Sequence, residues 1–227
     1  MQEQATASDI HPEIHTISLG ISQAYLLAGP DSACLVDAGV AGQEKRILRA
    51  IQALGHDTLK LIFITHAHLD HYGSAAALRE ITGAEIVVHH ADADAMARGD
   101  TILGESRRRG KIVGPFLPFA EFLLGTPPTP ADALLDDGDT LEKWGIDARV
   151  LHTPGHTTGS CCLLTQSGAA FVGDLLSGGR HPHAQRYYAD DWGQIPVSIA
   201  RLRDQQPELI YAGHGSLPVT AAQLAAL

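Results

Sequence analysis

The chain has 227 residues, of which 44% are hydrophobic, and its formal net charge at pH 7 is -10. This length and apolar content suit one domain with a full hydrophobic core and exclude a disordered chain. The negative charge disfavours nucleic acids and anionic membrane surfaces, which attract basic proteins. We therefore expect a globular protein that acts on a small molecule. The composition leaves a homodimer open.

The N-terminus and the cysteines bear on the cell compartment. Met1–Asp9 is polar and lacks the apolar stretch of a signal peptide, and no run reaches transmembrane length. The three cysteines, Cys34, Cys161 and Cys162, are too few for a disulfide framework. Cys161 and Cys162 are adjacent in an expected strand, so they should be buried on its opposite sides in a reducing environment. We expect a cytoplasmic protein.

Hydrophobic periodicity predicts strands and helices that alternate along most of the chain. Strands are expected at Glu13–Leu19, Ser22–Ala28, Ser32–Asp37, Leu59–Thr65, Glu85–His90, Ala148–His152, Ser160–Thr165, Ala169–Gly173 and Glu208–Ala212. Helices are expected at Gly42–Leu54, Tyr72–Thr82, Ala91–Arg98, Gly193–Gln205 and Thr220–Leu227. Hairpins come first and alternation follows, which favours mixed sheets flanked by helices over a purely parallel sheet.

The segment from about Gly99 to Asp137 interrupts this alternation. Its apolar stretch Phe116–Leu124 contains three of the five phenylalanines. Pro115 and Pro118 disfavour a long helix there. Because long irregular segments inside a compact domain usually serve function, we predict an insertion that forms a lid or pocket wall. A dimer contact and packing against a sheet edge are the alternatives.

The most informative stretch is Thr65–His71, which reads Thr-His-Ala-His-Leu-Asp-His. It follows the apolar run Leu61–Ile64, which is typical of a buried strand. The first two histidines can point the same way from an extended segment, whereas the aspartate and the third histidine enter the next helix. Three imidazoles and one carboxylate so close together suit Zn²⁺, or a borderline ion such as Fe or Mn.

Three further expected strands also end in a potential ligand. The run at 148–151 leads into His152–Thr157, the run at 169–172 into Gly173-Asp174, and the run at 209–212 into Gly213-His214-Gly215. Glycine stands beside the ligand in three of the four strand ends and permits the backbone conformations that such loops need. Four strand ends of this kind predict a metal site rather than scattered surface histidines.

These residues resemble the metallo-β-lactamase superfamily and, within it, the hydrolases related to glyoxalase II. The segments Gln23–Leu27 and Cys34–Gly39 are similar to the opening hairpin and the Asp-x-Gly turn of that family. The resemblance extends from about Ile14 to Leu217. It implies an α/β fold, namely an αβ/βα four-layer sandwich of two mixed β-sheets flanked by helices, formed as a single domain over residues 1–227.

The resemblance also implies a ligand set for two divalent metal ions, most simply zinc, with iron or manganese as alternatives. Seven side chains would bind them: His66, His68 and His156 the first ion, Asp70, His71 and His214 the second, and Asp174 both. The nucleophile would be a metal-bound hydroxide, and Asp70 would pass a proton to the leaving group. The implied reaction is hydrolysis of a small ester, thioester or lactone, with no serine or cysteine nucleophile.

Several other polar residues allow both a functional and an ordinary structural interpretation. His89 and His152 are either hydrogen-bond partners of the ligands or ordinary loop histidines. Arg107–Lys111 is either a solvated face or a landing point for an anionic part of a substrate. Four residues after Asp174 are candidates for substrate contact: His181, His183, Tyr187 and Tyr188.

The chain departs from parts of the family. Asp174 disfavours a dedicated β-lactamase, because those enzymes lack the bridging aspartate. Only thirteen residues follow His214, whereas glyoxalase II enzymes carry a helical extension that helps to bind glutathione, so a glutathione thioester is in doubt. The alternative function is a mononuclear iron persulfide dioxygenase, which would use His66, His156 and Asp174. A non-catalytic, metal-stabilised binding protein is the second alternative.

Overall fold

The larger of the two main sheets begins with a hairpin and continues with parallel strands. The computed structural model describes residues 13–29, 33–56, 58–101, 103–113 and 125–227. The six strands of this sheet lie in the order β1 (Glu13–Ser18), β2 (Gln23–Ala28), β3 (Ala33–Val36), β4 (Leu59–Ile64), β5 (Glu85–His89) and β7 (Ala133–Leu135). β1, β2 and β3 pair antiparallel, whereas β3, β4, β5 and β7 pair parallel.

The second sheet has five strands and comes from the C-terminal half. Its order is β15 (Val219–Thr220), β14 (Leu209–Tyr211), β10 (Ala169–Phe171), β9 (Cys161–Thr165) and β8 (Ala148–His152). β10 and β14 are parallel, and the other pairs are antiparallel. Two short ribbons complete the strands: β11 (Leu176–Ser177) with β12 (His183–Ala184), and β6 (Glu105–Ser106) with β13 (Tyr188–Ala189).

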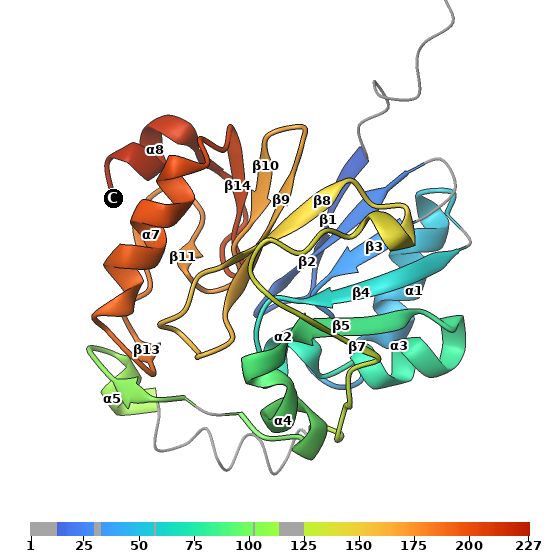
Figure 1. The fold of residues 1–227 in the computed structure, drawn as a ribbon. Helices are drawn as coiled ribbons and strands as arrows, with labels where there is room; N and C mark the ends of the chain where they lie inside the picture. Colours follow the sequence, from blue (N-terminus) through green and yellow to red (C-terminus); the bar gives the residue numbers. More distant parts are fainter. Residues whose placement is uncertain (1–12, 30–32, 57, 102, 114–124) are drawn as a thin grey trace, which may run out of the picture.

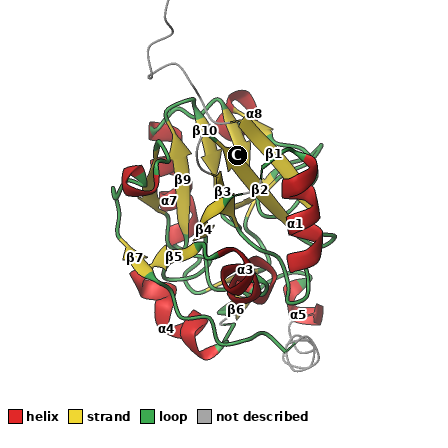
Figure 2. Cartoon of the chain, turned by 90° about the vertical axis from the view of Figure 1, so that its right-hand side faces the viewer, coloured by secondary structure: helices red, strands yellow, loops and turns green. Residues whose placement is uncertain are grey.

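Helices cover the outer faces of both sheets (Figure 1). On the first sheet these are α1 (Glu44–Ala53), α3 (Ala75–Thr82) and α4 (His90–Arg98), and on the second α7 (Gln194–Asp204) and α8 (Ala221–Ala225). The short helices α2 (Leu69–Tyr72) and α5 (Gly110–Val113) and the 3-10 turn η2 (Glu142–Trp144) belong to connecting segments, and Trp144 packs between the two sheets. Figure 2, viewed from the side of α1 and α3, shows the strands behind these helices. Among the described residues, no helix is long and apolar enough to cross a membrane.

Successive side chains of each central strand point to opposite faces of its sheet, so the apolar residues form three layers. In β4, Ile62 and Ile64 pack toward the helices of the first sheet, together with Leu78 of α3. Leu61 and Phe63 face the other way and pack between the two sheets. A third layer lies between the second sheet and the helices α7 and α8. This is the αβ/βα sandwich that the resemblance implied, and the fold prediction is confirmed.

The cysteines follow the same alternation. Cys161 contributes to the layer between the sheets, whereas Cys162 contributes to the layer beneath α7. Both thiols and that of Cys34 are free and buried. The prediction that the adjacent pair faces opposite sides of one strand is therefore confirmed.

The helix predicted at Tyr72–Thr82 is wrong at its start, because the chain forms two helices, α2 and α3. The break falls at Gly73 and Ser74, where the chain packs against the loop before α1. A Cβ on Gly73 would lie 2.5 Å from the backbone nitrogen of Ala41. Ser74 Oγ donates to the carbonyl of Val40 at 2.6 Å and accepts from the amide of Gln43 at 2.8 Å. Tertiary contacts thus override a continuous helical pattern.

The remaining differences concern short or undescribed segments. Strand ends differ from the predictions by one or two residues, and the short strands β6, β7, β11, β12, β13 and β15 were not predicted. These strands have only two or three residues, too few for a periodic signal. The apolar stretch Phe116–Leu124 lies outside the described residues.

Candidate metal centre

The ends of four strands bring all seven predicted ligands together. His66 and His68 lie after β4, and Asp70 and His71 lie in α2, which follows directly. His156 lies after β8, Asp174 after β10 and His214 after β14. They form three overlapping groups, and within each group the ligand atoms lie within 4.8 Å of one another. The groups are His66, His68 and His156; His66, His71 and Asp174; and Asp70, His71 and His214.

The first group consists of three buried histidines, His66, His68 and His156. Their ring centroids are 4.5–4.7 Å apart, and the ring planes are tilted by 72–81°, so the rings are close without stacking. His68 Nδ1 and His156 Nε2 are 3.0 Å apart. Burial lowers the pKa of His156 to about 3 and that of His66 well below its usual value. Both imidazoles are therefore neutral at neutral pH, which is the form that binds metal.

The second group, Asp70, His71 and His214, is charged. His214 Nε2 lies 3.3 Å from Asp70 Oδ2, and His71 Nε2 lies 3.8 Å from it. Burial opposes protonation of His71, but nearby carboxylates raise its pKa to about 10. Asp174 raises the pKa of His214 to about 12. Burial alone would raise the pKa of Asp70, but the adjacent His71 and His214 lower it to about 2.

Asp174 lies between the two groups. Its Oδ1 is 3.4 Å from His71 Nε2, and its Oδ2 is 3.3 Å from His214 Nε2 and 3.5 Å from His156 Nε2. Burial raises the pKa of this carboxyl, but His214 and His71 outweigh it and hold the pKa well below its usual range. The loop that follows β14 fits closely here, since a Cβ on Gly213 would lie 2.5 Å from the His71 ring.

Asp37 supports the site, although it is not among the seven ligands predicted from the sequence. Its carboxylate accepts hydrogen bonds from the Thr65 amide at 2.9 Å and from the Thr65 hydroxyl. Its Oδ2 is 2.8 Å from His71 Nδ1. A carboxylate in this position fixes the ring so that Nε2 faces the metal. The signal in the sequence was the Asp-x-Gly turn, which holds Asp37 at a φ of 61°.

Backbone carbonyls orient two further ligands in the same way. His156 Nδ1 is 2.9 Å from the carbonyl of Tyr188, and His214 Nδ1 is 2.6 Å from that of Ile21. Gln185 donates to the carbonyl of Asp174 at 3.1 Å. With Nδ1 acting as donor, Nε2 is the nitrogen of each histidine that could bind a cation, in His214 after it has lost its proton. Sequence alone could not identify these carbonyls, because any residue type provides one.

Three buried atoms at the centre have no hydrogen-bond partner within the described residues. They are Nε2 of His66, Nε2 of His71 and Oδ1 of Asp174. Buried polar atoms are nearly always paired, so orphans of this kind point to a missing ion or water. Imidazole nitrogens and carboxylate oxygens are suitable ligands for zinc and for other borderline divalent ions. The residues present therefore fit the metal ions that the ligand pattern implied.

A cavity of about 400 Å³ opens onto the ligands. Besides five of the ligands, eight residues line it: Ile21, Leu69, Thr101, Leu103, Ser177, Gln185, Tyr187 and Tyr188. Of the four residues suggested for substrate contact, the two tyrosines thus line the cavity. His183 packs edge-on against Tyr187 with ring centroids 6.1 Å apart, and His181 is exposed.

The other candidates have different environments. His89 and His152 stack on each other, with ring centroids 4.0 Å apart and planes within 9°. His89 Nδ1 accepts from the amide of Ala91, and His152 Nε2 is 2.9 Å from the carbonyl of Thr158. Each ring thus has one nitrogen within hydrogen-bond distance of the backbone, and neither ring is among the seven predicted ligands. In the basic run, Arg107 lies over the Trp192 ring at 4.5 Å.

Comparison with known proteins agrees with this geometry. A family model described as the metallo-beta-lactamase superfamily matches residues 17–214. Hydroxyacylglutathione hydrolase GloC of Haemophilus influenzae is 30% identical over 195 residues, which cover 82% of this chain and 81% of the relative. The structure of the B3 metallo-beta-lactamase BLEG-1 aligns with a TM-score of 0.72 at 26% identity, covering 95% of this chain and 97% of that one. TTHA1623 in a di-iron-bound form aligns with a TM-score of 0.70 at 26% identity, covering 94% and 96%. With its fold, its strand-end ligands and these matches in agreement, the chain belongs to the metallo-β-lactamase superfamily.

Proposed function

We propose that the protein is a dinuclear metallohydrolase that cleaves a small ester, thioester or lactone. The observation that carries this proposal is the position of Asp174 between the two ligand groups. Its Oδ2 lies 3.5 Å from His156 of the first group and 3.3 Å from His214 of the second, and its Oδ1 lies 3.4 Å from His71 of the second. A carboxylate in that position can be shared by two cations. His66, His68 and His156 would hold one ion, and Asp70, His71 and His214 the other.

The metals, when bound, supply an activated water for attack on a carbonyl carbon. Two serines in the ligand-bearing segments, Ser74 and Ser160, already have hydrogen-bond partners. Ser74 Oγ donates to the carbonyl of Val40, and Ser160 Oγ accepts from the amide of Thr157. Asp70 lines the cavity beside the ligands, and in this proposal its carboxylate takes up the proton that the attacking water releases and passes it to the leaving oxygen or sulfur as the bond to the carbonyl carbon breaks.

The cavity lining supports an uncharged acyl group. Leucine, isoleucine and tyrosine side chains form much of the wall, and none of the described lining residues is a lysine or arginine. An apolar wall with a few polar groups suits a short acyl chain or a ring. A thioester stays within the proposal, because the relative from Haemophilus influenzae is named a hydroxyacylglutathione hydrolase.

Metal analysis and a substrate panel test the proposal together. Protein reconstituted with zinc should hold close to two equivalents and should hydrolyse members of a panel of esters, thioesters and lactones. Turnover in heavy-oxygen water should place the label in the acid product, with no acyl adduct on Ser74 or Ser160 by mass spectrometry. Two bound equivalents without turnover of any panel member would contradict the hydrolase, and a single equivalent would contradict the dinuclear centre.

The described residues at the start of the 99–137 segment are proposed to form part of the pocket wall. Thr101 and Leu103 line the cavity, and Thr101 Oγ1 accepts from the amide of Leu69 at 3.1 Å. Leu103→Ala should raise KM for a bulky apolar thioester by about tenfold and spare an acetyl ester. Ile112→Ala, in the same segment but 71% exposed, is the matched control. Loss of dimerisation in sedimentation with unchanged KM would favour an interface instead.

A persulfide dioxygenase-like oxidoreductase is the second candidate, and one contact favours it. His156 Nε2 lies 3.5 Å from Asp174 Oδ2, so the two histidines and one carboxylate that a mononuclear iron site needs are close together. The neighbour TTHA1623 was solved in a di-iron-bound form, which makes iron a metal to test. Oxygen uptake with glutathione persulfide, by iron-loaded but not zinc-loaded protein, would identify this activity.

A further inference from the structure

One buried carboxylate joins the two loops that carry the three-histidine group. Asp92 lies in the first turn of α4 and is 4% exposed. Its Oδ2 accepts hydrogen bonds from the Ala67 amide at 2.8 Å and from the Thr157 hydroxyl at 2.7 Å. Its Oδ1 accepts from the Gly159 amide at 2.7 Å. Asp92 therefore binds three donors from two different loops.

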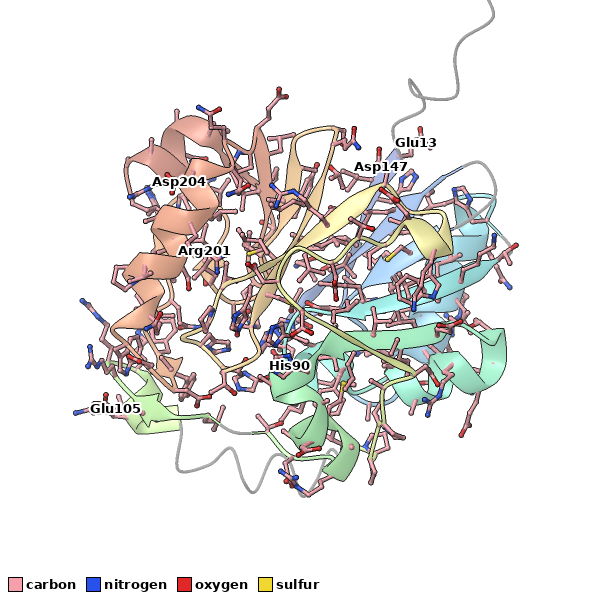
Figure 3. All side chains as sticks on the ribbon, viewed as in Figure 1. Glu13, His90, Glu105, Asp147, Arg201 and Asp204 are labelled. Atoms are coloured by element: carbon pink, nitrogen blue, oxygen red, sulfur yellow. The ribbon has the colours of Figure 1, made fainter. Side chains whose placement is uncertain are left out.

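The positions of these donors connect Asp92 to the ligands. Ala67 stands between His66 and His68, and Thr157 directly follows His156. One loop leaves the first sheet and the other leaves the second, so Asp92 spans the seam between the two sheets at the metal centre. Figure 3 labels His90, which marks the start of α4, two residues before Asp92.

Gly159 shows how closely the loop approaches the carboxylate. A Cβ at this position would lie 2.5 Å from both Cγ and Oδ1 of Asp92, which no real contact allows. The loop is held further by Ser160, whose Oγ is 2.7 Å from the Thr157 hydroxyl. A glycine here permits the short bond between the Gly159 amide and the carboxylate.

Capping of α4 does not require Asp92. The N-cap is His89, whose ring nitrogen accepts from the amide of Ala91. The hydrogen bonds that occupy the Asp92 carboxylate run to the two ligand loops instead. A buried carboxylate with three hydrogen bonds sets the separation of its donors more tightly than apolar packing does, because each bond has a preferred length and direction.

We propose that Asp92 is a positioning residue of the metal centre, which sets the spacing between the His66–His68 loop and the His156 loop. By holding these loops in register, it keeps the three imidazole nitrogens at the separation that one metal ion needs. This inference rests on the metal binding of the proposed function and is independent of the reaction that follows.

The test compares Asp92→Asn with Asp94→Asn, an exposed aspartate two residues further along the same helix. An amide cannot accept all three bonds, so Asp92→Asn should lower zinc affinity by about 10- to 100-fold, the loss typical of outer-shell ligand partners. Affinity is measured by chelator competition in folded protein. The visible spectrum of the cobalt-loaded protein should also shift, whereas Asp94→Asn should match the unmodified protein in both.

A second pair of variants keeps the test valid if Asp92→Asn does not fold. Thr157→Val removes one of the three donors, and Thr157→Ser restores the hydroxyl. Weakened zinc binding and an altered cobalt spectrum in the valine variant, rescued in the serine variant, would support the proposal.

Variants that lower Tm but keep the zinc affinity and the cobalt spectrum would overturn it, because Asp92 would then only stabilise the fold. If the unmodified protein bound no metal, the proposed function would fail first, and this inference would fail with it.

Discussion

The two ligand groups differ in charge and in burial, although they share Asp174. His66, His68 and His156 are all buried, and the lowered pKa values of His66 and His156 keep these rings neutral. In the other group, the raised pKa values of His71 and His214 keep them protonated, and the side chain of His214 is 33% exposed. One group is thus ready for a cation, whereas the other must first release protons.

This difference has a physical origin in what surrounds each group. The three histidine rings pack against one another. Hydrogen bonds on the side away from the centre hold them, such as that between His156 Nδ1 and the carbonyl of Tyr188. The second group contains Asp70 beside its histidines, with Asp174 adjacent and Asp37 behind His71. Carboxylates attract either protons or metal ions. We therefore expect the three-histidine group to fill first, and the second group to bind with proton release.

Loss of the shared carboxylate should have the largest effect, because it removes the link between the groups. Asp174→Ala should weaken both sites and lower kcat/KM by more than about 100-fold, beyond the loss seen for outer-shell changes. Elemental analysis and kinetics on the same preparation check this. Near-normal turnover at full metal loading would show that Asp174 is not shared.

Loss of His214 should affect the two groups unequally. His214→Ala removes a ligand of the second group only, so the protein should retain close to one equivalent of zinc and lose most of its activity. His90→Ala, a histidine more than half exposed and outside the site, serves as the control. If His214→Ala lost both equivalents, the two groups would not be separable as proposed.

The support behind His71 should have a smaller effect. Asp37→Asn replaces the carboxylate that faces His71 Nδ1 at 2.8 Å, so the ring loses both orientation and negative charge. Zinc affinity of the second group should fall by about 10- to 100-fold, with the first group less affected. Asp132→Asn, which alters a carboxylate bonded to the amide of Ile86 away from the site, is the matched control. Equal weakening of both groups would contradict the assignment.

The smallest expected effect concerns a histidine outside the ligand set. Burial, with His152 and His90, lowers the pKa of His89 from 6.5 to about 4. The unfolded chain therefore takes up a proton near pH 6.5 that the folded chain refuses until about pH 4, so stability falls as pH decreases through this window.

His89→Asn keeps the acceptor for the Ala91 amide but does not titrate. Between pH 7 and pH 5, the two pKa values correspond to about 2 kcal/mol. The metal-free unmodified protein should therefore lose about 4–8 °C more in Tm than the variant, since 1 kcal/mol shifts Tm by about 2–4 °C at this size. Parallel Tm profiles for the two proteins would exclude a contribution from His89.

The sequence by itself indicated which strands lead into candidate ligands, and its resemblance to the superfamily implied the proposed ligand set. Leu61–Ile64 is typical of a buried strand, and the histidine-rich turn directly after it, together with three similar strand ends, predicted a metal site. The same reasoning applied to Asp174 and His214, each at the end of an apolar run. These signals are local, since they depend on side-chain type and on alternation over a few residues.

Apart from Asp37, which the Asp-x-Gly turn signals in the sequence, only the tertiary structure decided which groups stand behind the ligands. Asp92 lies in a helix that, by its pattern, is an ordinary amphipathic one, and its link to Ala67 and Gly159 crosses between the two sheets. The break between α2 and α3 likewise depends on the loop at Val40–Ala41. Contacts of this kind join residues far apart in the chain, and no local pattern encodes them, because their formation depends on how the two sheets pack together.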